Sequence, residues 1–177
     1  MVNTTFSDRL EKHNGNLCTV RFLSYRRDDS GDAVNWLYEK LDQKFGANIL
    51  FMDTGSIEPA DSWDDKILKK LEESEIVLVV IANEWLIKGI DEFGRRRIDK
   101  ENDWVRMEIK TALNRSKMVY PILIDGAKMP PPDALPDPIK RLSNHQAYEV
   151  NVNAGSNSGI EGLFNLLNNT LTKQYAG

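Results

Sequence analysis

The run Ile76-Val77-Leu78-Val79-Val80-Ile81 decides the fold class of this 177-residue chain. All of its residues are isoleucine, valine or leucine, and no polar residue alternates with them. A strand of that composition is buried on both faces, as the central strands of parallel sheets are. We therefore expect this run to be an inner strand of a parallel sheet.

Further strands and helices flank this run in alternation. We expect the other strands at residues 17–23, 49–52, 118–124 and 147–150. Apolar residues at helical spacing predict helices after Gly31, from about Trp63, after Asp103 and from about Ile160. Strands that alternate with helices imply right-handed crossovers and a parallel sheet with helices on both faces. About five strands indicate the flavodoxin-like, doubly wound α/β arrangement.

Composition and charge are those of an ordinary globular domain. Hydrophobic residues make up 41% of the chain and charged residues 28%. The net charge of -4 argues against direct binding of nucleic acid. One cysteine allows no internal disulfide, and no apolar run suits a signal peptide or a membrane span. We expect a cytoplasmic protein without membrane contact: an N-terminal extension at 1–16, one domain at 17–173 and a tail at 174–177.

Two loops are expected to form the ligand site. In open α/β sheets, ligands bind outside the carboxyl ends of the strands, near the switch in strand order. The loops that flank this switch are Ser24–Gly31 and the long, irregular Asn83–Asp103. Loops as long as the second are uncommon in compact domains unless they are functional. Together they supply aromatic and basic side chains: Tyr25, Arg26, Arg27, Trp85, Arg95, Arg96 and Arg97.

Trp104 and Glu108 lie one turn apart on the helix that Asp103 is expected to cap. Their face is rotated by about 100° from the core stripe of Val105 and Ile109. Glu108 is therefore expected at the edge of the buried surface. An aromatic ring beside a carboxylate suits a ligand that has a flat ring and develops positive charge.

In their order along residues 17–171, these motifs resemble the TIR family. Phe22-Leu23-Ser24-Tyr25-Arg26-Arg27 matches the first strand and Leu50-Phe51-Met52-Asp53 the second. Residues 53–60 occupy the place of the BB loop, although Pro59-Ala60 departs from the usual turn. The segment from Asp103 to Ile109 is similar to the WxxxE motif of TIR NAD hydrolases, of the bacterial and axon-degeneration type.

The resemblance implies cleavage of NAD⁺ to nicotinamide and ADP-ribose or a cyclic ADP-ribose isomer. Glu108 is then the catalytic residue, because a carboxylate can stabilise the oxocarbenium-like ribose that nicotinamide leaves behind. NAD⁺ is the substrate, so neither a cofactor nor a metal ion is expected. The expected substrate-binding residues are Tyr25, Arg26, Arg27, Phe51, Trp85 and Trp104. For Arg26 or Arg27 the physical reason is the fit of guanidinium to diphosphate.

The resemblance also implies activation by TIR–TIR assembly, in immune or antiphage defence signalling. The partners would be other TIR domains and a sensor or effector protein. Three other interpretations stay open at this point: a non-catalytic TIR interaction module, a phosphoacceptor receiver domain, and a protein that binds a nucleotide signal without turnover. Glu108 by itself is typical of a solvated helix residue, and Trp104 of a packing residue.

Overall fold

A computed structural model describes residues 21–46, 50–52, 63–152 and 159–174 of the chain, with the backbone alone for 63–66 and 171–174. The predicted BB loop, residues 53–60, and the first part of the predicted strand at 17–23 lie outside these residues.

The strands form one parallel sheet in the order β2-β1-β3-β4-β5. Their bounds are Arg21–Ser24 for β1, Leu50–Met52 for β2, Ile76–Ile81 for β3, Met118–Ile124 for β4 and Tyr148–Val150 for β5. All residues of β3 are buried, and β3 lies between β1 and β4. The predicted flavodoxin-like arrangement is therefore confirmed.

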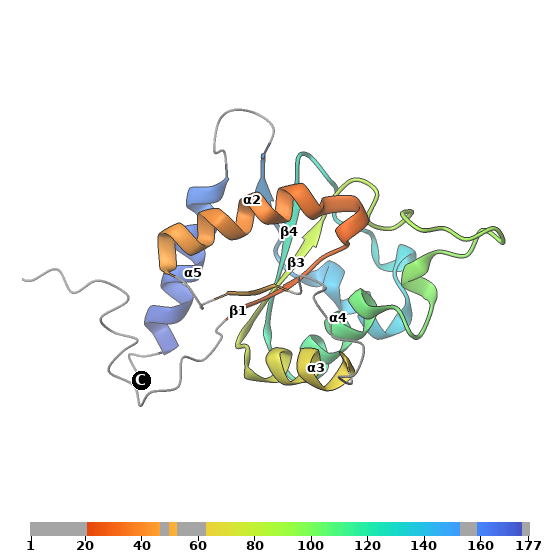
Figure 1. The fold of residues 1–177 in the computed structure, drawn as a ribbon, viewed down its shortest axis with the longest axis horizontal. Helices are drawn as coiled ribbons and strands as arrows, with labels where there is room; N and C mark the ends of the chain where they lie inside the picture. The colour runs from red at the N-terminus through yellow and green to blue at the C-terminus, as the bar shows by residue number, and fades with distance from the viewer. Residues whose placement is uncertain (1–20, 47–49, 53–62, 153–158, 175–177) are drawn as a thin grey trace, which may run out of the picture.

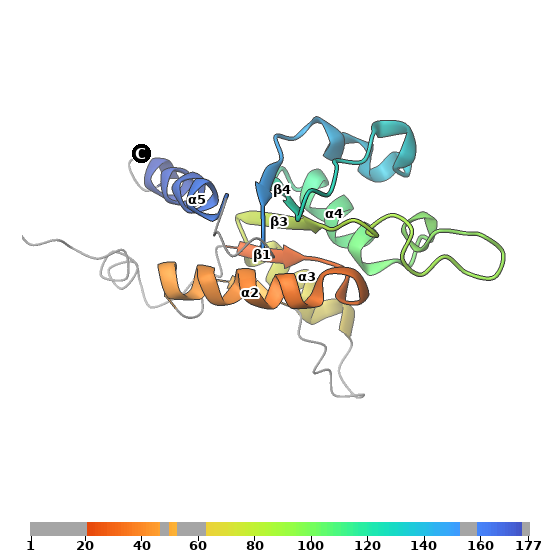
Figure 2. The same ribbon diagram turned by 90° about the horizontal axis from the view of Figure 1, so that it is seen from above.

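Helices cover both faces of this sheet, as predicted (Figures 1 and 2). Their bounds are Arg27–Phe45 for α2, Trp63–Glu73 for α3, Trp104–Asn114 for α4 and Ile160–Gln174 for α5. Residues of α2 and α5 form one hydrophobic cluster with one face of the sheet. Residues of α3 and α4 form a second cluster with the other face. None of the helices in the described ranges is long and apolar enough to cross a membrane.

The strand order reverses between β1 and β3. From β1 the chain passes to β2 on one side, and then crosses to β3 on the other side of β1. Ser24 pairs in register with Val79, so the carboxyl ends of both strands meet at one edge of the sheet. The segments that follow β1 and β3 therefore lie where open α/β sheets bind their ligands.

The first helix begins earlier than predicted. Ser24–Gly31 was expected to be a loop, but α2 starts at Arg27. Asp28 and Asp29 favour this start, because negative charge in the first turn interacts favourably with the helix dipole. The Ser30 hydroxyl also donates a hydrogen bond to the Arg26 carbonyl at 3.0 Å. The acidic first turn that looked like loop sequence is part of the helix.

The proline-rich segment Met129–Pro138 contains helical turns. The 3₁₀ helix η2 spans Pro132–Ala134, and the longer η3 spans Asp137–Asn144. Both begin at or next to a proline, whose fixed φ suits a helix start. Ile139 and Leu142 of η3 are fully buried in the cluster that contains α4.

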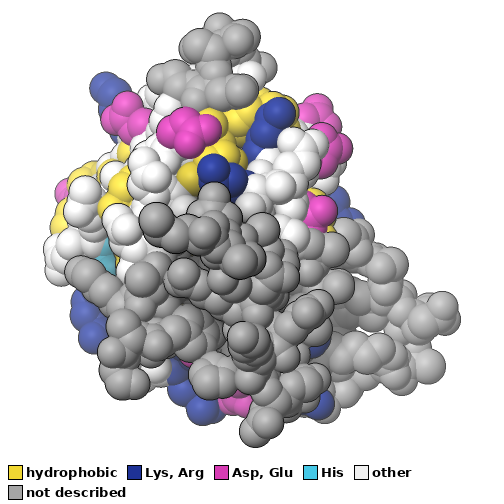
Figure 3. Space-filling view, turned by 90° about the vertical axis from the view of Figure 1, so that its left-hand side faces the viewer, with side chains coloured by type: hydrophobic (Ala, Val, Ile, Leu, Met, Phe, Trp, Pro, Cys, Tyr) yellow, Lys and Arg dark blue, Asp and Glu magenta, His cyan; other side chains and the backbone are white. Residues whose placement is uncertain are grey.

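Residues 83–102, called the arm here, extend away from the sheet (Figures 1 and 2). Apart from the 3₁₀ helix η1, Arg97–Asp99, the arm consists of turns and irregular chain, as predicted. The arm carries the exposed large hydrophobic residues Ile87, Ile90 and Phe93, the last of them 73% exposed. On the opposite side of the molecule, acidic and basic side chains of described residues are interspersed (Figure 3).

Candidate active site

Glu108 and Ser24 meet at the carboxyl end of β1. The Ser24 hydroxyl donates a hydrogen bond to Glu108 Oε2 at 2.6 Å. Ser24 is fully buried and Glu108 is 7% exposed. Side chains alternate along a strand, so Ser24 shares the sheet face of Phe22, which packs in the cluster that contains α4. Glu108 is thus more deeply buried than the edge position that helical spacing predicts.

Asp103 connects α4 to the segment after β1. Its Oδ1 accepts a hydrogen bond from the Arg106 backbone N–H at 3.0 Å, which confirms the predicted N-cap. Both carboxylate oxygens of Asp103 also accept hydrogen bonds from the Arg26 guanidinium, at 3.0 and 3.1 Å. Such a bidentate, charge-assisted pair fixes orientation as well as distance.

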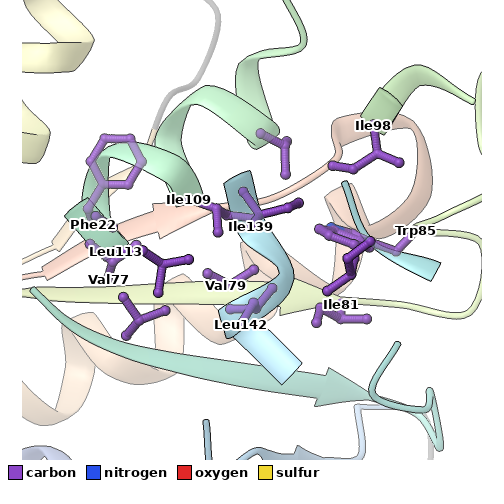
Figure 4. Packing of buried hydrophobic residues seen from close by; sticks show 14 of the residues in the cluster. Phe22, Val77, Val79, Ile81, Trp85, Ile98, Ile109, Leu113, Ile139 and Leu142 are labelled. Atoms are coloured by element: carbon purple, nitrogen blue, oxygen red, sulfur yellow. The ribbon is translucent and has the colours of Figure 1, made fainter. Parts of the chain in front are cut away.

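Arg26 is also bound to the base of the arm. Its Nε donates to the Trp85 carbonyl at 2.9 Å, and its guanidinium lies 5.7 Å from the centroid of the Trp85 ring. Trp85 is 1% exposed and packs in the same cluster as Ile81 and Ile98 (Figure 4). Arg26 therefore holds together the end of β1, the start of the arm and the start of α4.

The arm makes further contacts with the two helix starts. Arg97 lies 3.4 Å from the Asp103 carboxylate and 3.3 Å from that of Asp28. The Glu84 backbone N–H donates to Asp29 Oδ1 at 3.2 Å. Burial raises the pKa of Asp29, and the hydrogen bond from Glu84 opposes this effect. These contacts make the base of the arm part of the site's framework.

The predicted site residues have different surroundings. Glu108, Arg26 and Trp85 are buried together, whereas Arg27, the first residue of α2, is exposed. Tyr25 and Trp104 are half-buried. All of their roles toward a substrate remain predictions. The contacts of Arg26 and Trp85 show in addition that both organise the protein itself.

Phe51 lies on the neighbouring strand. It is half-buried and stacks on Phe22, with 5.4 Å between the ring centroids. Phe51 pairs with Phe22 in the sheet, so it lies beside the strand that carries Ser24. A substrate contact of Phe51 also remains a prediction.

Two contributors to this arrangement were missed in the sequence. Ser24 was treated as loop, although its phase with Phe22 places it on a buried face. Asp103 was identified as a helix cap but not as the partner of Arg26. The available signal was the opposite charge of Arg26, in the first predicted loop, and Asp103, at the end of the second. These two residues are 77 positions apart, so their spacing does not indicate that they meet.

The site offers carboxylate, hydroxyl and guanidinium groups. Within the described ranges, no three histidine, cysteine, aspartate or glutamate side chains form a group that could hold a metal ion. The chemistry that these groups can perform by themselves is charge stabilisation and hydrogen bonding by a buried carboxylate.

Comparison with known proteins identifies a family for this chain. The family described as "TIR domain" matches residues 22–156. The NAD(+) hydrolase SARM1 of Danio rerio is 26% identical over 121 residues, which cover 68% of this chain. The match covers 16% of the SARM1 chain, so the chain corresponds to a small part of that relative.

Two solved structures share the fold. The TIR domains of the activated Roq1 resistosome, which directly recognises the pathogen effector XopQ, superpose with a TM-score of 0.57 at 16% identity. That match covers 83% of this chain and 98% of the other. A metazoan TIR-STING receptor from C. gigas, in complex with 2',3'-cGAMP, gives 0.55 at 16% identity and covers 85% and 39%.

Proposed function

The chain belongs to the TIR domain family, and on that basis we propose that it cleaves NAD⁺ at the nicotinamide–ribose bond. The observation that carries the proposal is the buried carboxylate of Glu108, at the carboxyl end of β1 and one helical turn beyond Trp104. The relative from Danio rerio, which is named an NAD(+) hydrolase, supports the same activity.

Glu108 acts on the sugar rather than on the leaving group. Nicotinamide departs as a neutral molecule from a cationic pyridinium, so no acid is needed to protonate it. The bond that breaks leaves an oxocarbenium-like ribose, which a carboxylate stabilises by its charge and by hydrogen bonds to the ribose hydroxyls. Water, or the adenine of the same molecule, then attacks the sugar carbon and gives ADP-ribose or its cyclic isomer.

The framework around Glu108 supports this chemistry by fixing α4. The Arg26–Asp103 pair holds the first turn of the helix, and Glu108 follows one turn later. Preorganised groups stabilise developing charge better than groups that must rearrange during the reaction. Arg27, which is exposed at the start of α2, is the arginine we propose for the diphosphate.

We also propose that activity requires self-association. The arm exposes three large apolar side chains, Ile87, Ile90 and Phe93, which we propose as the contact surface. Association at the arm would reach Glu108 through Arg97, Asp103 and the start of α4. A cytoplasmic role in immune or antiphage defence signalling, with a sensor or effector partner, is supported by the family resemblance.

Nicotinamide release from NAD⁺ tests the proposal directly. The purified chain is incubated with NAD⁺ at rising protein concentration, and nicotinamide is separated and measured by chromatography. We expect release by the wild-type chain and a loss of at least about 100-fold in Glu108→Ala. Glu101→Ala, which removes an exposed carboxylate before α4, serves as the matched control.

Two results would contradict the enzyme. One is full activity in Glu108→Ala, and the other is an assembled wild-type sample that releases no nicotinamide. The second result would leave a non-catalytic TIR interaction module, which the exposed apolar arm equally suits.

A further inference from the structure

We propose that Ser24 is a positioning residue that orients the Glu108 carboxylate for its reaction with the ribose. This inference rests on the proposed NAD⁺ cleavage and adds to it a residue that acts only through Glu108. The contact that supports it joins residues 84 positions apart, from β1 and α4, at 2.6 Å.

The Ser24 backbone is held rigidly by its strand. Ser24 pairs with Val79 of β3, and the preceding Leu23 pairs with both Met52 of β2 and Leu78 of β3. A short side chain on such a backbone has one rotatable bond that positions its oxygen. Glu108, by contrast, has a long side chain with several rotamers. The serine is therefore the fixed partner, and the glutamate is the side chain that it orients.

The length and burial of the contact favour a strong hydrogen bond. At 2.6 Å, the distance falls in the range of O–H donors that bind ionised acceptors. Ser24 is fully buried, so water does not compete for its hydroxyl. A hydrogen bond to a charged group in such surroundings is stronger than one in solvent. It restricts Glu108 before any substrate arrives.

Packing by itself gives no reason for a hydroxyl at this position. Ser24 lies on the sheet face of Phe22, in phase with apolar side chains of the α3 and α4 cluster. An apolar residue there would bury more surface and leave no polar group to satisfy. The hydroxyl is explained by the carboxylate that it binds, and a buried carboxylate that costs stability is explained by catalysis.

The test compares three variants of Ser24 with a buried serine elsewhere. Ser24→Ala removes the hydroxyl, Ser24→Thr keeps it on a residue type that suits strands, and Ser24→Cys replaces it with a weak donor of similar shape. The control is Ser74→Ala, because Ser74 is fully buried and its hydroxyl donates to the Lys70 carbonyl at 2.7 Å. Ser74 precedes β3, at the opposite edge of the sheet from Glu108.

We expect a change in kcat rather than in KM. Ser24→Ala and Ser24→Cys should lower kcat for nicotinamide release by roughly 10- to 100-fold, with KM within about threefold of wild type. Ser24→Thr should restore kcat to within about fivefold. Ser74→Ala should leave kcat unchanged. Circular dichroism gives the folded fraction by which each rate is divided, and Ser24→Cys provides the comparison if Ser24→Ala does not fold.

A double variant tests whether Ser24 acts through Glu108. In the Glu108→Ala background, which has no acceptor for the Ser24 hydroxyl, the further change Ser24→Ala should lower the residual rate by less than about twofold. An equal loss in both backgrounds would overturn the inference, and so would wild-type kcat in Ser24→Ala or a Thr variant as slow as the Ala variant. In these cases an active wild-type chain and an inactive Glu108→Ala chain would leave the proposed function standing. If the assembled wild-type chain releases no nicotinamide, both proposals are wrong.

Discussion

Arg26 and Asp103 form a bidentate ion pair in which neither side chain is more than 2% exposed. Arg26 follows β1 after one intervening residue, Tyr25, and Asp103 caps α4, so the pair joins the sheet to the helix of Glu108. Burying two charges costs free energy, and a buried charge that loses its partner strongly destabilises the fold. The pair thus fixes the start of α4, while the apolar face of the helix packs in the cluster against the sheet.

Asp103→Asn should be strongly destabilising. The change leaves the Arg26 guanidinium buried beside a neutral amide, and loss of one partner of a buried pair costs about 3–5 kcal/mol. Urea unfolding followed by circular dichroism measures this loss. The double variant Arg26→Met/Asp103→Asn removes both charges, keeps a side chain that can cap α4 and should recover most of it. If Asp103→Asn alone lowers the free energy of unfolding by less than about 1 kcal/mol, the pair does not hold α4.

Glu108→Gln should separate stability from activity. The amide oxygen can still accept the hydrogen bond from Ser24, and a neutral group is less costly to bury than a carboxylate. We expect a free energy of unfolding within about 1 kcal/mol of wild type, or above it, together with loss of nicotinamide release. Thermal unfolding and the release assay on the same sample check both expectations. A variant that unfolds and loses activity together would indicate a structural role for Glu108.

Phe93→Ser should weaken assembly without changing the fold. Phe93 of the arm is 73% exposed, and the centroid of its ring lies 5.3 Å from the Arg95 guanidinium. We expect the free energy of unfolding of this variant to lie within about 0.5 kcal/mol of the wild-type value, as for other surface substitutions. Light scattering should show less association, and specific activity should rise only at higher protein concentration. Specific activity that is independent of concentration in the wild-type chain would remove assembly from the proposal.

The turn that Asp91 and Arg95 form in the arm should open in acid. The pKa of Asp91 is lowered to about 2, chiefly because its carboxylate accepts the hydrogen bond of the Arg95 backbone N–H. A lowered pKa stabilises the folded turn above the ordinary value near 4, and this contribution is lost as pH falls toward 2. Amide hydrogen exchange at Phe93 and Arg95, whose N–H groups bind Asp91, should therefore lose protection over that range.

Asp91→Asn provides the comparison for this pH dependence. The variant should show weak protection of both amides at all pH values, because a neutral amide accepts hydrogen bonds less strongly. Asp137→Asn is the control. The pKa of Asp137 is also lowered, by Lys140 of η3, but Asp137 lies outside the arm, so this variant should leave the protection of Phe93 and Arg95 unchanged. Protection at Phe93 that persists unchanged at pH 2 would show that backbone contacts alone hold the turn.

The sequence by itself determined the sheet, its inner strand and the helices around it. Ile76–Ile81 could be identified as a central strand because its composition reports burial on both faces. Asp103 could be identified as a cap because it lies beside the turn that it caps. The predicted start of α2 was wrong, because the acidic residues of a first helical turn resemble those of a polar loop. Each of these features depends on residues that are close along the chain.

Only the tertiary structure decided which side chains meet at the site. Ser24 with Glu108 and Arg26 with Asp103 are separated by 84 and 77 residues. Their contacts depend on the pairing of β1 with β3 and on the packing of α4 against the sheet, which no local spacing specifies. The chemistry of the groups is written in the sequence, but hydrogen bonds require alignment within a few tenths of an ångström. That alignment arises only when distant segments pack into one core.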